Sequence, residues 1–462
     1  MRFSTLPNIP TCFFINLLLK TSMDNSSHVS SSSGNSAKDK DKIFPSFTEL
    51  RIYPSFSEIR EKFNAPQNFK MYFPREVYEQ IVQGSLSVEG LPVATQTAVT
   101  KANNLEGQTV FIHRSREAPI ECLVIRPTDL LLKDVKSNRY IRASAYDLEY
   151  VTIPEEEGTE VTFALKQSGD AILCYLIQGI TWSPRYNLKV DRTNDQHLFE
   201  AWADMTNSTK RDYKIKHTEL FGGDVKLQNV NNYRYEAQSY SCCCECSALG
   251  GSNEEIKIES QGEIAGLYYY SIDQSFILAS QSTFSLPFVE VNIKLEKYSK
   301  VELYFLERTQ KGKFQRIYRI EGDKFLPAGT CTVREDGRVV GQAKLPDMGV
   351  KDKHDLECGS EVDVGYNREV NVLSKKRHSA SFSIKLSIKN TKEKRSMKYE
   401  YSEIIQGKFV VTPKGENNRN DLLNITPNGF KIVNELQANG DTHVFEYEVH
   451  LDYKTNDDED EK

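Results

Sequence analysis

Hydrophobic and polar residues alternate with a period of two in several segments of the chain's second half. The clearest is 445–453, where Phe, Tyr, Val, Leu and Tyr alternate with Glu, Glu, His and Asp, and the same pattern runs through 382–389 and 289–296. Successive side chains of a strand point to opposite faces, so each segment has one buried and one solvated face. Antiparallel sheets have this pattern, whereas parallel sheets buried on both faces give continuous apolar runs. The fold class is therefore predicted to be all-β, with antiparallel sheets in several domains.

Helical periodicity is nearly absent. The best candidate is 74–82, where Pro74 suits a first turn, Val77 and Ile81 share one face, and Gly84 ends the segment. Two similar segments, 44–51 and 53–60, predict two sequential strands.

Five short apolar segments separated by turn residues follow between 105 and 156. They cover 109–112, 120–125, 130–132, 140–142 and 148–153. Short strands at this spacing predict a small SH3-like barrel. Such barrels bind peptides or RNA in some proteins, but a fold alone does not assign that role, and we interpret the segment as a structural module.

Turn signals and shifts in composition divide the chain into six parts. The final part with strands has about six of them, which predicts an antiparallel β-sandwich. The predicted parts are a disordered leader (1–42), N-terminal strands with a short helix (43–104), the small barrel (105–156), a central β domain (157–365) with a flexible insertion (231–262), the C-terminal sandwich (366–454) and an acidic tail (455–462).

Charge and hydropathy exclude some function classes. The 65 acidic residues outnumber the 59 basic ones, giving a formal charge of −6, so we expect no nucleic-acid partner. No apolar run reaches the roughly 18 residues of a membrane span. Scattered single cysteines suit free thiols in a reducing compartment, so we expect a cytoplasmic protein. Secretion through a weak N-terminal signal, with an apolar run at 12–19, is the alternative.

A cysteine cluster in the predicted insertion is the strongest candidate in the sequence for metal binding or thiol chemistry. Cys243 and Cys246 form a CxxC pair, which can bind zinc or exchange disulfides, but a structural zinc site needs four ligands. The adjacent thiols of Cys242, Cys243 and Cys244 would also suit acylation at a membrane surface. We interpret the cluster as part of a surface loop, keep metal binding and acylation as alternatives, and expect no cofactor.

Enzyme motifs are absent from the sequence. There is no GxSxG, P-loop, HExxH or nucleotide fingerprint, so we predict that the chain is not an enzyme. Asp191, Asp204 and Asp224 could act as paired carboxylates in glycoside hydrolysis if they meet at one sheet edge. Aspartates at strand ends are more often turn formers.

The segment 179–224 contains both tryptophans, Trp182 and Trp202, together with Arg185 and Tyr186. These four residues are candidates either for core packing or for a recognition surface. Aromatic residues spaced along strands more often pack inside a sandwich. We expect packing, with Arg185 stacked on a ring and paired with a carboxylate such as Asp191.

The order of these motifs resembles the mucoidy-inhibitor-A-like family of uncharacterised β-rich proteins, a domain-of-unknown-function family of bacteria and some eukaryotes. The resemblance includes Trp182, Trp202, Asp224 and, downstream, 284–287 and 325–329, and it covers most of 47–453. Bacterial members usually have a coiled-coil hairpin. No sustained heptad pattern occurs in this chain, so it is similar to a eukaryotic short form without the hairpin.

The leading functional hypothesis is a non-catalytic interaction or scaffold protein that presents sheet faces or edges to a protein partner. The alternative is a polysaccharide-acting hydrolase or glycan-binding protein that uses strand-end carboxylates. It is suggested by the capsule-related phenotype that the resemblance implies.

Overall fold

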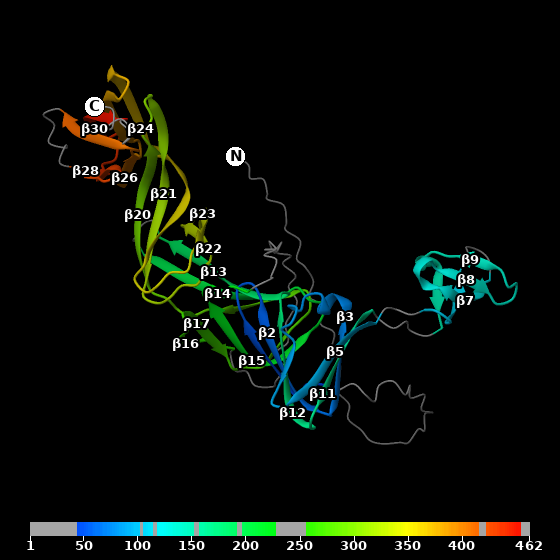
Figure 1. Cartoon of the computed structure of the whole chain (residues 1–462). Coiled ribbons are helices and arrows are strands. Elements are labelled where there is room, and N and C mark those ends of the chain that lie inside the picture. Colours follow the sequence, from blue (N-terminus) through cyan, green and yellow to red (C-terminus); the bar gives the residue numbers. More distant parts are fainter. Residues whose placement is uncertain are drawn as a thin grey trace, which may run out of the picture. The chain divides into compact units, whose positions relative to one another are not determined.

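The computed structural model describes residues 44–101, 105–113, 118–151, 157–191, 196–227, 256–414 and 422–453. The chain divides into two units, Met1–Phe44 and Pro45–Lys462. The predicted leader, the acidic tail and residues 231–255 of the predicted insertion, which include the cysteine cluster, lie outside the described residues. The predicted end of the insertion at 262 is wrong, because residues 259–262 belong to strand β16 (Glu259–Ile264). The described part consists mainly of β-strands in five sheets (Figure 1). The all-β prediction is confirmed.

An eight-stranded sheet contains the first strands of the chain. The two similar segments near the N-terminus form β1 and β2, as predicted, and β1 pairs in parallel with β15. The sheet order is β16 (Glu259–Ile264), β17 (Leu267–Ile272), β15 (Tyr213–Gly222), β1 (Phe47–Ile52), β2 (Ser57–Ala65), β12 (Gly169–Ile177) and β4 (Ser87–Glu89), and β18 (Phe276–Leu278) also pairs with β15.

A three-stranded sheet packs against the eight-stranded one. Its order is β3 (Asn68–Pro74), β11 (Gly158–Leu165) and β5 (Val93–Lys101), all antiparallel. The ring centroids of Phe63 and Phe69 lie 5.2 Å apart, and those of Phe73 and Tyr175 lie 5.6 Å apart. These contacts place β3 over β2 and β12.

The predicted helix at 74–82 is shorter than expected. Only α1 (Arg75–Tyr78) is helical, preceded by Pro74. The amide of Ile81 donates to the Tyr78 carbonyl, and Ile81 forms a β-bridge with Ile177. Pairing with the neighbouring strand β12 therefore replaces the helical turns that the sequence pattern favours.

The small barrel forms as a five-stranded antiparallel sheet curled around one apolar core. All five strands match the predicted segments to within a few residues, and every strand contributes to a core that includes Val110, Cys122 and Leu132. The order is β10 (Leu148–Tyr150), β6 (Thr109–Ile112), β7 (Ile120–Arg126), β8 (Leu131–Asp134) and β9 (Tyr140–Arg142), with short 3-10 turns η1 (Pro127–Asp129) and η2 (Ala145–Asp147).

A second five-stranded sheet contains the aromatic segment. Strands β13 and β22 pair in parallel, and the other pairs are antiparallel. The order is β19 (Ser282–Pro287), β14 (His197–Asn207), β13 (Ile180–Val190), β22 (Gly329–Glu335) and β23 (Arg338–Leu345).

The C-terminal sandwich is a single nine-stranded sheet folded over on itself. Strands distant in the sheet order pack face to face around one core, and the rings of Phe430 and Tyr447 lie 4.9 Å apart. The order is β27 (Lys408–Lys414), β30 (Thr442–Asp452), β25 (Ser379–Asn390), β24 (Lys353–Lys375), β21 (Gln310–Gly322), β20 (Ile293–Tyr304), β26 (Met397–Ile404), β29 (Gly429–Leu436) and β28 (Leu423–Thr426).

Strand β24 spans the residues between which we predicted a domain boundary, 365 and 366. Strands β20 and β21, assigned by the sequence to the central domain, hydrogen-bond into the nine-stranded sheet. Strand β20 begins at Ile293 rather than at 289, because the Asp323 carboxylate accepts the Asn292 amide at 3.0 Å. The alternation at 289–292 therefore reports burial alone, whereas from Ile293 the same alternation continues in the paired strand β20.

A buried ion pair lies at the centre of the folded sheet. The guanidinium of Arg368 donates to the carboxylate of Glu403, and both side chains are 0 % exposed. Tyr401 and Tyr447 donate to the same carboxylate at 2.6 and 3.2 Å. Burial is the main reason that the pKa of Tyr401 and that of Tyr447 are raised well above the usual value, and the charge of Glu403 raises them further. Both hydroxyls therefore remain protonated and act as donors.

The described residues contain no helix with the length and apolar character that a membrane crossing requires.

Removing one member of the buried pair should destabilise the sandwich strongly. We expect Arg368→Met to lower the free energy of unfolding by about 3–5 kcal/mol, because Glu403 is then a buried charge without its cation. Denaturant unfolding measures the change. The double variant Arg368→Met/Glu403→Leu should recover much of the loss. A double variant as unstable as the single one would contradict this account.

Candidate functional site

The aromatic segment is mainly a packing centre. Alternation along β13 places Trp182 and Tyr186 on its buried face. The indole Nε1 of Trp182 donates to the carbonyl of Phe221 in β15 at 2.8 Å, and its ring packs 5.6 Å from that of Phe288. The hydroxyl of Tyr186 donates to the Pro327 carbonyl at 2.8 Å. Trp182 thus links the five-stranded sheet of β13 to the eight-stranded sheet.

Arg185 and Trp202 lie on the opposite, solvated face of the same sheet, so the expectation of core packing is wrong for these two residues. The guanidinium of Arg185 lies 5.7 Å from the centroid of the Trp202 ring, as expected. Its carboxylate partner is Asp204, at 2.9 Å, so the predicted pairing with Asp191 is wrong. The register explains the choice, because Arg185 is opposite Trp202 in the β13–β14 pair and Asp204 lies two residues further along β14.

Asp191 and Asp204 do not form a carboxylate pair. Asp204 is opposite Ser183, whereas Asp191 follows the far end of β13. Along β13, Asp191 lies eight residues from Ser183, which at about 3.3 Å per residue places it roughly 26 Å from the position of Asp204. Glycosidase carboxyl pairs lie about 5–10 Å apart. Asp224 follows β15 in another sheet. Asp204 is held instead by Arg185 and by the Ser285 hydroxyl at 2.7 Å.

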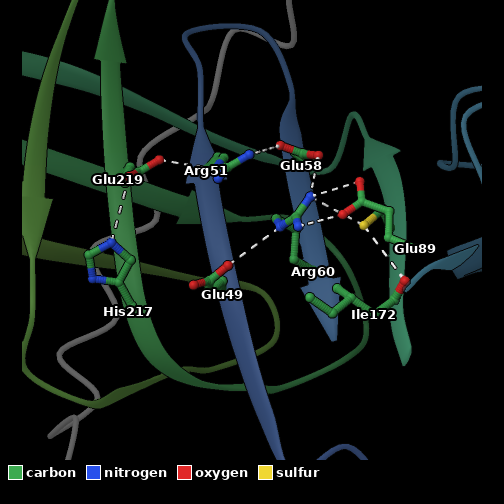
Figure 2. Close-up of polar contacts among 9 residues, drawn as sticks. Glu49, Arg51, Glu58, Arg60, Glu89, Ile172, His217 and Glu219 are labelled. Carbon is green, nitrogen blue, oxygen red and sulfur yellow. Dashed lines mark hydrogen bonds and ion pairs between the residues drawn. The ribbon is translucent and has the colours of Figure 1, made fainter. Parts of the chain in front are cut away.

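A charged network covers the polar face of the eight-stranded sheet (Figure 2). Each arginine bridges carboxylates on different strands. Arg60 of β2 pairs with Glu49 of the neighbouring β1 at 3.4 Å and reaches across β12 to Glu89 of β4 at 2.7 Å. Arg60 also donates to the Cys174 sulfur at 3.3 Å. The network consists of Glu49 and Arg51 of β1, Glu58 and Arg60 of β2, Glu89 of β4, and His217 and Glu219 of β15. Its contacts hold the strands of the sheet together.

An open groove of about 760 Å³ lies beside β20 and β21. Five basic and four acidic side chains line it. Five of these charges pair within the groove: Lys297 with Glu335 at 3.5 Å, and both Arg316 and Lys392 with Glu361 at 3.3 and 3.1 Å. A groove in which both signs of charge are mixed and more than half of the charges are paired offers little attraction to a charged small ligand.

The four cysteines in the described part are buried free thiols: Cys122, Cys174, Cys331 and Cys358. Burial raises the pKa of Cys331 to about 12 and that of Cys358 to about 11, so both remain protonated and unreactive. No group of three or more His, Cys, Asp or Glu in the described residues is arranged to hold a metal ion. Cys243 and Cys246, the predicted metal candidates, lie outside these residues.

Strand β5 is the most unusual surface feature. All nine residues are exposed, including Val99 at 52 %. Strand β5 pairs on one side with β11 and ends the three-stranded sheet on the other. The buried side chains of this sheet come from β3 and β11, so β5 extends past the core and neither of its faces is covered.

The hydrogen-bond pattern identifies the backbone groups at the open edge of β5. In β11, Leu165 donates toward β3 at 2.7 Å, and Lys166 donates toward the β5 side at 3.0 Å. Donors of a strand alternate in direction, so even-numbered residues of β11 bond to β5. The even-numbered residues of β11 are opposite Thr95, Thr97, Val99 and Lys101 of β5, so the backbone groups of these four β5 residues point toward β11. The N–H and C=O groups of Gln96, Ala98 and Thr100 therefore point away from the sheet.

Five other edge strands of at least six residues in the described part have features that discourage further pairing, and in β19 this feature is Pro287 at its end. Charged residues, proline and bulges have this effect. β3 contains Lys70 and Pro74, β16 has a bulge and two glutamates, β23 has a bulge and two basic residues, and β27 contains Pro413 and two lysines. β5 has no proline, and its one charge, Lys101, is at its end. Its register shift lies near Val93, so Thr95 to Lys101 is regular.

Sequence reasoning named sheet edges as a class of interaction surface but did not identify β5. The segment 93–101 contains only one charge and is rich in Val and Thr, which signals a strand. Its exposure on both faces depends on where the core ends.

Comparisons of the chain with protein-family models, with curated proteins and with solved structures found no match.

The two tryptophans should differ sharply in their effect on stability. We expect Trp182→Ala to lower the free energy of unfolding by about 3–5 kcal/mol, because a large buried side chain is lost. Trp202→Ala removes a surface stacking contact and should cost about 1 kcal/mol. Denaturant unfolding, followed by the fluorescence of the remaining tryptophan, measures both. Equal losses in the two variants would contradict the packing assignment.

The charged network should make the free energy of unfolding depend slightly on pH in the acidic range. The Arg60 hydrogen bond lowers the pKa of Glu89 below its usual value. A lowered folded-state pKa stabilises the fold above about pH 4.5, and this contribution is lost as the pH falls through the folded-state value. We expect Arg60→Gln to raise the Glu89 pKa toward its usual value, as measured by carboxyl NMR titration. Lys62→Gln on the same strand is the control and should leave the Glu89 pKa unchanged.

Proposed function

We propose that this chain is a non-catalytic interaction or scaffold protein that binds its partner by strand addition at β5. In this mode, an extended segment of the partner hydrogen-bonds to the open edge and continues the sheet. The observation that supports the proposal is β5 itself, a regular strand exposed on both faces with an open backbone edge.

The energetic argument concerns the three outward backbone positions. Gln96, Ala98 and Thr100 each present a donor and an acceptor. A partner strand can satisfy these groups without any change in the pairing of β5 with β11. The flanking Thr97 and Val99 are β-branched and suit cross-strand side-chain contacts. Main-chain bonds supply affinity in this mode, and alternate side chains supply specificity.

The partner inferred from these features is a protein segment with an extended, mainly uncharged stretch. A segment with a carboxylate opposite Lys101 would have to compete with Glu160, which pairs with Lys101 at 2.7 Å. We also propose that the chain is a short form of the mucoidy-inhibitor-A-like family; the order of its sequence motifs supports this proposal.

Amide hydrogen exchange at the open edge of β5, measured with and without a partner, tests the proposed function. A photo-crosslinking side chain at Thr97 of the full chain captures a partner, which is then identified and purified. We expect this partner to slow amide hydrogen exchange at Gln96, Ala98 and Thr100. Ala98→Pro should weaken its binding by at least about tenfold, because proline removes an outward donor.

The matched control is Lys70→Pro on β3, the opposite edge of the same sheet. The pairing of β3 with β11 directs the Lys70 amide outward, as for Ala98, so both substitutions have the same backbone effect. Lys70→Pro should bind the partner with unchanged affinity. A partner that binds both variants equally, or that leaves exchange in β5 unchanged, would contradict strand addition at this edge.

A further inference from the structure

The sequence of β5 allows two copies of this strand to pair with each other along their open edges. We propose that the strand added to β5 is β5 of a second copy of this chain, so that two three-stranded sheets join into one continuous antiparallel sheet. This inference rests on the proposed function and names the partner.

Symmetry limits the possible registers to a few. In an antiparallel pair related by a two-fold axis, outward-pointing residues must face outward-pointing residues. The even-numbered residues of β5 point outward. One suitable register therefore centres on Ala98, with Gln96 opposite Thr100. The other centres on Thr97, with Gln96 opposite Ala98. Both keep most of the regular stretch paired.

Neither register brings like charges together. Lys101 is the single charged residue of β5, and it lies opposite Thr95 in the first register and Val93 in the second. Like charges directly opposite each other destabilise a strand pair. The glutamates of β16, and the basic residues of β23 and β27, make those edges less suited to self-pairing.

Side-chain pairs across the interface also fit. In the register centred on Ala98, two Thr97–Val99 pairs form on one face. The register centred on Thr97 places two Thr95–Val99 pairs there. Threonine and valine are β-branched residues that pack well in cross-strand pairs. On the other face, the facing residues are Gln96, Ala98 and Thr100, which are small or flexible enough to avoid a clash.

Sedimentation velocity of the purified full-length chain over a wide concentration range tests the inference. We expect a reversible dimer. Ala98→Pro should raise its dissociation constant at least about tenfold, because the substitution removes one interchain donor from each copy. Lys70→Pro is the matched control and should dimerise like the wild type. Thermal unfolding of both variants shows whether each remains folded.

A second variant pair reports the register and does not depend on proline. Thr97→Cys and Ala98→Cys place equivalent thiols near the two-fold axis in one register or the other, at Cα separations that a disulfide can bridge. Mild oxidation followed by mass spectrometry of the linked peptides should show a symmetric crosslink at one of these positions. A dimer that crosslinks at neither position would overturn the inference.

The outcomes separate this inference from the proposed function. A chain that stays monomeric, with rapid exchange at Gln96, Ala98 and Thr100 at every concentration, overturns self-pairing. In that case, protection of the same amides by a different captured protein would still support strand addition. A dimer that is unaffected by Ala98→Pro but weakened by Lys70→Pro would place the interface on the other edge and overturn the inference.

Discussion

Pairing of backbone N–H and C=O groups between strands is the constraint on which this structure depends. A strand satisfies these groups only through its neighbours, so long all-β chains build wide sheets and leave two edges on every open one. The structure limits the number of edges by joining nine strands into one sheet, which folds over a common core, and the small sheet curls around a core of its own. Strand β5 remains as a long edge without proline or central charge, and the functional proposal starts there.

Polar groups inside the cores determine which faces meet. Glu403 accepts bonds from Arg368, Tyr401 and Tyr447, which belong to β24, β26 and β30. In the eight-stranded sheet, the buried Glu61 pairs with Arg211, whose guanidinium also contacts the Tyr175 hydroxyl at 3.2 Å. Hydrophobic burial alone tolerates many packings. A buried carboxylate tolerates only packings that supply its donors, so these clusters disfavour alternative arrangements of the sheets.

The prediction of individual elements from the sequence succeeded where contacts are local. The strands of the small barrel follow directly from short apolar segments and turns, since neighbouring strands pair in sequence except for β10 with β6. Prediction was less accurate where distant segments compete. The predicted helix stops after Tyr78 because Ile81 forms a bridge with Ile177. Arg185 pairs with Asp204 of the neighbouring strand rather than with Asp191, which is nearer to it in the sequence. Register, which sequence alone does not specify, decides both cases.

Local patterns were enough to predict that this chain is built of β-strands, which side of its regularly alternating segments is buried, and where its small barrel lies, because period-two alternation and turn residues act locally. Which strands share a sheet follows from long-range packing. Strands β20 and β21 join the C-terminal sheet, and β24 runs through an apparent boundary. The tertiary structure also decided that β5 extends past the core. Exposure of a strand edge depends on the position of every other strand, and no local pattern contains that information.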